Sequence, residues 1–177
     1  MPEPWSPKVE LLPVTAFVPN LKAVFERDFG RALTYYSLGA ELRDVQAINT
    51  ARQASAQWPV MNLLPYGNDP GMNEDAALIN EKPRLLCEWE TKSRVANSLA
   101  THLVSYVTAG RSVLYEMSLA DLTGLSVQIP QGNRADLFWD VSQERYGERF
   151  YEAENLYTMV GSVVLTINYS EGKKRHG

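Results

Sequence analysis

The chain has 177 residues, a formal net charge of −4 and 45% hydrophobic residues, which suits one domain that buries about two thirds of its unfolded surface. No large block is basic enough for specific duplex binding, and no apolar run approaches the ~20 residues that cross a bilayer, so we expect a protein made in a cytosol. The single cysteine, Cys87, excludes an internal disulfide, and its apolar neighbours favour a small buried side chain over a nucleophile.

The first 19 residues are the first predicted element, an extended arm. They contain five prolines, which prevent a helix and break any long strand. Apolar residues such as Trp5 and Phe17 are too frequent for a disordered tag. We therefore expect residues 1–19 to lie against their own domain or against a neighbouring subunit.

Residues 21–38 show the clearest helical pattern in the chain. Apolar side chains return every three or four residues from Leu21 onward, and charged side chains lie largely on the opposite face. Asn20 is a candidate cap for the first turn, and Gly39 can adopt the left-handed conformation that ends a helix. The pattern is weaker in residues 40–57, which predict a helical or irregular connection.

Two strands joined by a long loop are predicted next. Residues 58–64 are an apolar run that begins at a Trp-Pro step. Residues 84–90 alternate in hydropathy, with Leu85 and Trp89 on the same face. The connection, residues 67–82, contains a strong turn and several carboxylates without the spacing of a calcium loop, and it predicts a long acidic hairpin loop.

A second amphipathic helix is predicted at residues 95–109, with Ser93 as its cap and Gly110 at its end. Residues 125–129 alternate between apolar and polar side chains and predict another strand. Residues 135–155 combine recurring glutamates and arginines with a glycine, so a mobile charged hairpin loop and a short helix are both compatible with them.

Residues 161–169 carry the clearest strand signal, because a period-two pattern runs through them: Val163, Leu165, Ile167 and Tyr169 alternate with Ser162, Thr166 and Asn168. The predicted fold class is α+β, a single mainly antiparallel sheet packed by two amphipathic helices. We expect the domain to span residues 20–170, followed by a charged tail at residues 171–177. Its sheet should contain residues 58–64, 84–90, 125–129 and 161–169, and its core should bring Leu165 and Ile167 against Phe25, Phe29, Leu99 and Leu103.

Catalytic and metal-binding patterns are missing from the sequence. The two histidines, His102 and His176, form no zinc-ligand spacing with Cys87 or with carboxylates. No phosphate-binding glycine loop and no G-x-S-x-G turn occurs. We therefore expect no enzyme activity, no metal and no cofactor.

Protein contacts are the better interpretation of the remaining polar and aromatic clusters. Tyrosine and arginine occur together at residues 145–151, a mixture that is typical of protein–protein interfaces. The arm and the acidic loop supply the other candidates. The predicted interface residues are Trp5, Phe17, Asp69, Glu74, Asp75, Arg145, Tyr146, Arg149, Phe150 and Tyr151.

The order of these elements resembles the tail terminator, or tail completion, proteins of long-tailed bacteriophages. In that family a first helix precedes a strand with an aromatic-Pro-apolar entry, here Trp58-Pro59-Val60-Met61. A hairpin partner at residues 85–90, a helix at residues 95–107 and a last strand at residues 163–169 follow. The resemblance covers residues 20–169. The proline-rich arm and the long segment at residues 136–154 depart from the family pattern.

This resemblance implies a hexameric ring, with one sheet per subunit packed against helices. Such a ring caps the tail tube, stops its growth and joins it to the head–tail connector, and DNA is only a passing cargo. The protein would then be found in the virion, with residues 67–82 and 136–154 as contacts to the tube or the connector. Another neck or head–tail adaptor protein remains an alternative, as does a small ligand-binding module or enzyme with an unrecognised site.

Overall fold

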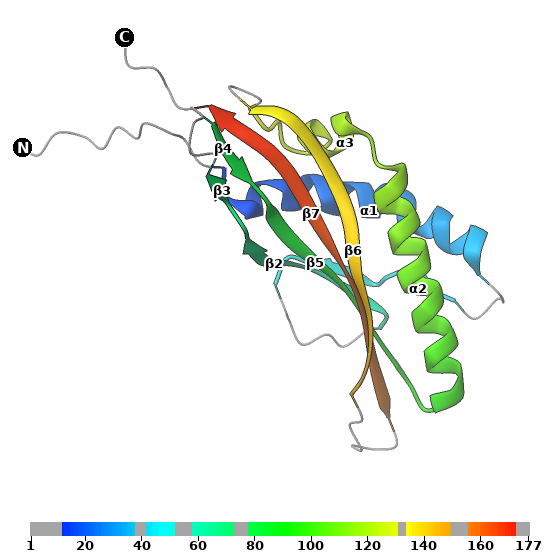
Figure 1. Ribbon diagram of the computed structural model, residues 1–177. Helices are drawn as coiled ribbons and strands as arrows, with labels where there is room; N and C mark the ends of the chain where they lie inside the picture. The colour runs from blue at the N-terminus through cyan, green and yellow to red at the C-terminus, as the bar shows by residue number, and fades with distance from the viewer. Residues whose placement is uncertain are drawn as a thin grey trace, which may run out of the picture.

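The computed structural model describes residues 12–37, 42–51, 58–72, 78–130, 134–149 and 156–172. Its fold is α+β, as predicted: one mixed, mainly antiparallel sheet with its helices on one face (Figure 1). The elements in chain order are the 3-10 helix η1 (Val14–Phe17), α1 (Val18–Tyr36), β1 (Ala47–Asn49), β2 (Val60–Asn68), β3 (Gly71–Met72), β4 (Leu78–Glu81), β5 (Pro83–Ser93), α2 (Ala96–Glu116), α3 (Leu119–Gly124), β6 (Arg134–Arg149) and β7 (Tyr157–Gly172). None of the described helices is long and apolar enough to cross a membrane.

Strand β7 lies at the centre of the sheet. One edge of β7 pairs antiparallel with β6 from Thr158 to Glu171. Its other edge pairs with β5 and, near the end of the strand, with β4. β2 pairs with β5, and β3 pairs with β4, which makes one long hairpin of these four strands. β1 adds to β2 in the parallel direction. Eight of the sixteen residues predicted as the acidic loop 67–82 therefore belong to the sheet, and residues 73–77 lie outside the described residues.

The helix-covered face of the sheet forms the core. Leu85 and Trp89 of β5 are fully buried, as are Leu165 and Ile167 of β7. The Trp89 ring lies 6.1 Å from that of Phe29 in α1, at an interplanar angle of 16°. The alternation predicted for these two strands is confirmed, and so is the inward orientation of Leu165 and Ile167. β7 continues to Gly172, two residues into the predicted charged tail.

Helix α2 continues through Gly110, where the sequence predicted its end. A Cβ atom added at Gly110 would lie 2.0 Å from Cζ2 of Trp89. The glycine is therefore required where the tryptophan side chain crosses the helix backbone. At the start of α2, the N-cap residue is Val95 and not the predicted Ser93. Ser93 still contributes there, because its Oγ accepts a hydrogen bond from the backbone N–H of Val95.

Helical structure begins six residues before Asn20, which corrects the predicted extent of the arm. η1 follows Pro13, and Pro19 occupies the first turn of α1, where a backbone N–H has no helical partner. Prolines at these positions are compatible with helices. Phe17 is fully buried with its ring 6.1 Å from that of Tyr169, so it is a core residue and not an interface residue.

Asn20 lies inside α1, not at its cap, and its side chain holds a loop in place. Its Nδ2 donates to the carbonyl oxygens of Leu122 and Val127, at 2.9 and 2.8 Å. Its Oδ1 accepts from the backbone N–H groups of Ser126 and Val127, both at 2.7 Å. These bonds occupy backbone groups that a strand would use, and residues 125–129 are not the strand that their alternation predicted.

Strand β6 covers most of the segment predicted as a charged loop or short helix. Two bulges interrupt its pairing with β7, between Ala135 and Phe138 and between Ser142 and Arg145. Asp136 and Gln143 have positive φ angles there, 58° and 54°. No other described strand pairs with β6, and bulges of this kind are common on such edge strands.

Candidate functional site

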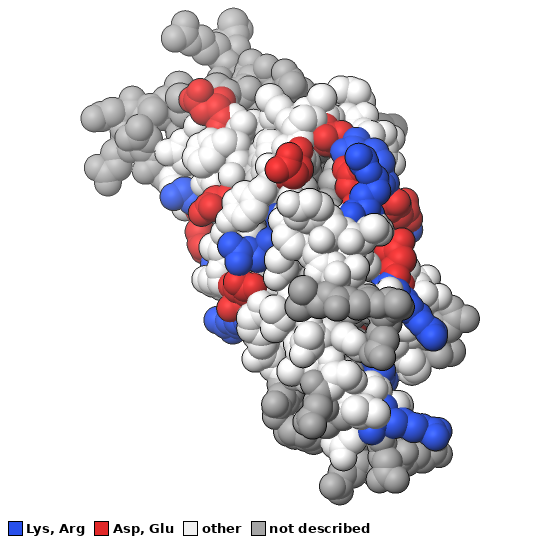
Figure 2. Space-filling view, turned by 90° about the vertical axis from the view of Figure 1, so that its right-hand side faces the viewer, with Lys and Arg blue, Asp and Glu red and all other residues white. Residues whose placement is uncertain are grey.

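Helix α2 presents an uncharged surface over most of its length. From Val95 to Gly110 the sequence has no Asp, Glu, Lys or Arg, yet Val95 is 61% exposed and Val104 48% exposed. On the side of the molecule that carries α2, charged side chains lie mainly along the two flanks (Figure 2). Because a solvent-facing helix surface is normally charged, this one is a candidate contact surface. We call it the α2 surface.

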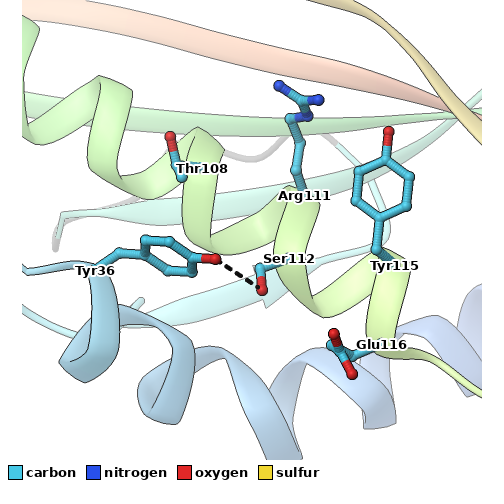
Figure 3. Close-up of a pocket in the computed structure, with 6 residues that line it drawn as sticks. All are labelled: Tyr36, Thr108, Arg111, Ser112, Tyr115 and Glu116. Atoms are coloured by element: carbon cyan, nitrogen blue, oxygen red, sulfur yellow. Dashed lines mark hydrogen bonds between the residues drawn. The ribbon is translucent and has the colours of Figure 1, made fainter.

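A pocket of about 350 Å³ opens where the second half of α2 meets the end of α1 (Figure 3). The Tyr36 side chain points from α1 toward α2, and its hydroxyl lies 3.5 Å from that of Ser112. The pocket combines four hydroxyl groups with one guanidinium, one carboxylate and two aromatic rings. Its lining residues are Tyr36, Thr108, Arg111, Ser112, Tyr115 and Glu116.

Arg111 is held in place from two sides. Its Nη1 lies 2.7 Å from Oε2 of Glu144 on β6, and its guanidinium carbon lies 5.8 Å from the ring centre of Tyr115. A hydrogen bond with Tyr115 raises the pKa of Arg111, so the side chain stays charged. A guanidinium has five N–H donors, and these contacts leave some of them for a ligand or partner.

Tyr146 extends this cluster onto β6. Its hydroxyl donates to Oε1 of Glu144, the carboxylate that also pairs with Arg111. Desolvation by burial, followed by this hydrogen bond, raises the pKa of Tyr146 to about 12. The ring is nevertheless 46% exposed, so it can contribute both to the internal cluster and to an external contact.

The raised pKa of Tyr146 gives an expected alkaline titration. The folded pKa lies above the value of about 10 for an unfolded chain. The group therefore contributes stability that is fully present below pH 10 and is lost as the pH rises through 12. In a titration followed by the ultraviolet absorbance of phenolate, Tyr146→Phe should remove one tyrosine that ionises near pH 12. Glu144→Gln should move the ionisation of Tyr146 to lower pH, because it removes the hydrogen-bonded carboxylate. An unchanged step in Tyr146→Phe would contradict the assignment.

Among the predicted interface residues that the structure describes, Tyr146 alone joins this cluster. Arg145 is exposed, but its register opposite Ser162 places it on the helix-free face of the sheet. Asp69 is paired with Arg84, with Oδ2 and Nη2 3.2 Å apart. Arg149 is the last residue of β6. The predicted residues Trp5, Glu74, Asp75, Phe150 and Tyr151 lie outside the described residues.

The sequence prediction missed the pocket because it ended the second helix at residue 109. Once the helix extends to Glu116, Thr108, Arg111 and Tyr115 are separated by three and four residues and share one face. That spacing was a signal for a polar and aromatic surface. Tyr36 packs against the core at the end of α1, and its contact with α2 shows that it also lines the pocket.

The described residues give little basis for metal or thiol chemistry. They contain no group of three His, Cys, Asp or Glu side chains that could hold a metal ion. Cys87 is fully buried, and burial raises the pKa of its thiol to about 12. The thiol is therefore protonated at neutral pH and is not a nucleophilic thiolate.

No protein-family model matches the chain, and no curated protein matches it. The functional proposal therefore rests on the order of the elements and on the geometry of the α2 surface and its pocket.

Proposed function

We propose that the protein is a structural virion protein of the tail terminator type, a hexameric ring that caps the phage tail tube and joins it to the head connector. The observation that carries the proposal is the α2 surface, an uncharged helix face from Val95 to Gly110 that continues into tyrosines and a positioned arginine. Tyr and Arg are enriched in protein interfaces, while charged side chains are depleted from interface centres. This surface suits contact with protein better than contact with water.

Ring geometry gives this surface a role. A ring subunit meets its neighbours through two different lateral surfaces, because a head-to-tail interface repeats until it closes. The α2 surface supplies one of them.

The axial contacts of the proposed ring are assigned to the two loops. The first of these, residues 67–82, includes Asp69, which pairs with Arg84. The Arg84 guanidinium also lies over the ring of the exposed Tyr66. The second, residues 136–154, is β6 as far as Arg149, and residues 150–154 lie outside the described residues. In this proposal the tube below and the connector above meet these ends, DNA passes through the ring, and no reaction is catalysed.

The pocket supports a second candidate function, a small ligand-binding module. Its volume of about 350 Å³ falls at the lower end of the range for small-molecule sites. Its lining is rich in hydroxyl groups, whereas such sites are mostly apolar. A ligand-binding module predicts a monomer or dimer in solution, and the ring predicts a larger assembly.

The ring is tested by mass measurement in solution together with negative-stain imaging. We expect ring particles with six times the subunit mass of 19.9 kDa. Val104→Glu should shift the population to smaller species, because it places a charge at the centre of the α2 surface. Val127→Glu is the matched control: both valines are 48% exposed, but Val127 lies beyond α3. A wild-type protein that remains monomeric at every concentration would exclude the ring.

A further inference from the structure

The pocket where α1 meets α2 is lined by groups that can hydrogen-bond in both directions. Four of its lining side chains carry a hydroxyl, which both donates and accepts: Tyr36, Thr108, Ser112 and Tyr115. Thr108, Arg111 and Tyr115 project from α2 in one direction (Figure 3). Tyr36 approaches from α1 on the other side of Ser112. A ligand in this space therefore meets hydroxyl groups from two helices.

The charges around the pocket do not favour an ionic ligand. Nη1 of Arg111 lies 2.7 Å from Oε2 of Glu144, and this carboxylate offsets the charge of the guanidinium. Glu116 adds an exposed carboxylate to the lining. An anionic ligand would meet two carboxylates and one guanidinium, and a cationic ligand would have to lie beside Arg111. The pocket therefore suits a neutral ligand.

The lining also disfavours a purely apolar ligand. Such a ligand would separate the hydroxyl groups from water without replacing their hydrogen bonds. The rings of Tyr36 and Tyr115 nevertheless offer apolar surface, and Tyr115 is 56% exposed. A sugar ring meets both conditions, because its C–H groups can lie against an aromatic ring while its hydroxyls bind polar side chains.

We propose that this pocket binds a neutral saccharide of one or two rings. Its volume of about 350 Å³, at the lower end of the range for small-molecule sites, limits the ligand to this size. The N–H donors of Arg111 that Glu144 leaves available and the carboxylate of Glu116 bind sugar hydroxyls, and the Tyr115 ring packs against the C–H groups. This inference rests on the second candidate function, the ligand-binding module, and not on the ring.

Saturation-transfer NMR on the full-length protein tests the site with neutral sugars. The probes are glucose, galactose, mannose and N-acetylglucosamine. Gluconate, which adds a carboxylate, and cyclohexanol, which keeps a six-membered ring with a single hydroxyl, are the control ligands. We expect saturable binding of at least one sugar with a Kd of about 1–10 mM, as is usual for a ligand of this size. Both control ligands should bind at least about tenfold more weakly.

A matched pair of tyrosine variants locates the binding. Tyr115→Ala removes a ring and a hydroxyl from the pocket and should weaken sugar binding about tenfold. Tyr66→Ala is the control, because Tyr66 is also exposed and also has an arginine near its ring, Arg84 at 5.4 Å, but does not line this pocket. Thr108→Val keeps the shape of its side chain and removes one hydroxyl, so it gives a second measurement if Tyr115→Ala fails to fold.

The outcomes separate this inference from the proposed ring. Rings that bind none of the sugars overturn the saccharide site and leave the ring standing. A monomer or dimer that binds a sugar through Tyr115 supports the site and overturns the hexamer. Rings that bind a sugar in this way support both, and a monomer that binds none overturns both. Equal effects of Tyr115→Ala and Tyr66→Ala would also overturn the site, because the sugar would then bind elsewhere.

Discussion

Gly110→Ala is expected to destabilise the protein strongly, although alanine favours helices by about 1 kcal/mol over glycine. The added Cβ would lie 2.0 Å from Cζ2 and 2.4 Å from Cη2 of Trp89, far inside van der Waals contact. The indole is fully buried, so it cannot move aside without disturbing the core. Overpacking of this kind costs about 1–3 kcal/mol or more, which thermal unfolding will show as a lower melting temperature.

Gly30→Ala is the matched control for this prediction, because Gly30 is also in a helix. A Cβ there would lie 2.8 Å from Oδ2 of Asp44, the end of a flexible side chain. That carboxylate can shift, and the substitution should be close to neutral. If both substitutions changed the melting temperature equally, the close approach of Trp89 to α2 would not be the reason for the glycine.

Ile167→Ala should have the other large effect on stability. Ile167 is fully buried at the centre of β7, opposite Trp139 of β6. Removing a buried isoleucine side chain to Ala costs about 2–5 kcal/mol, which for a chain of this size lowers the melting temperature by roughly 4–20 °C. Denaturant unfolding should show the same loss of free energy, with a lower midpoint.

Thr166→Ala tests whether the face of β7 has been assigned correctly. Thr166 is the preceding residue, and its side chain lies on the helix-free face, opposite Arg84 and Asp140. It is partly exposed, so its truncation leaves no closed cavity. We expect a change within about 0.5 kcal/mol. A loss as large as that of Ile167→Ala would show that both faces of β7 are equally packed.

The elements that the sequence predicted well are those with one continuous buried apolar face. On the helix side of β5 and β7, every second side chain is fully buried: Leu85, Cys87 and Trp89 on β5, and Val163, Leu165 and Ile167 on β7. α1 keeps its apolar stripe from Leu21 to Leu33. In each case one face meets the core along the whole element, so the pattern in the chain reports the packing directly.

β6 was missed because its bulges break that alternation. Each bulge adds a residue on β6 that has no partner on β7, and the following side chains change face. Trp139 and Val141 face the helices, and after the second bulge Tyr146 takes that side. A pattern that changes phase twice cannot be recognised from hydropathy alone.

The other corrections arise from contacts between distant parts of the chain. Asn20 holds the backbone of Ser126 and Val127, which overrides their strand-like alternation. Trp89 explains why a glycine occurs in the middle of α2. The candidate site was predicted in part: Tyr146 was recognised by residue type, whereas Arg111 acquires its role only from Glu144 on another element.

The central position of β7 has a consequence for synthesis on the ribosome. β7 is the last described element to be made, yet it pairs with β6 and with the second edge of β5. Until residues 157–172 emerge, the β2–β5 hairpin has an open edge and α2 has no complete sheet to cover. The sheet should therefore be completed only after these residues have left the ribosome, and chaperones that shield strand edges should bind the nascent chain longest before that point.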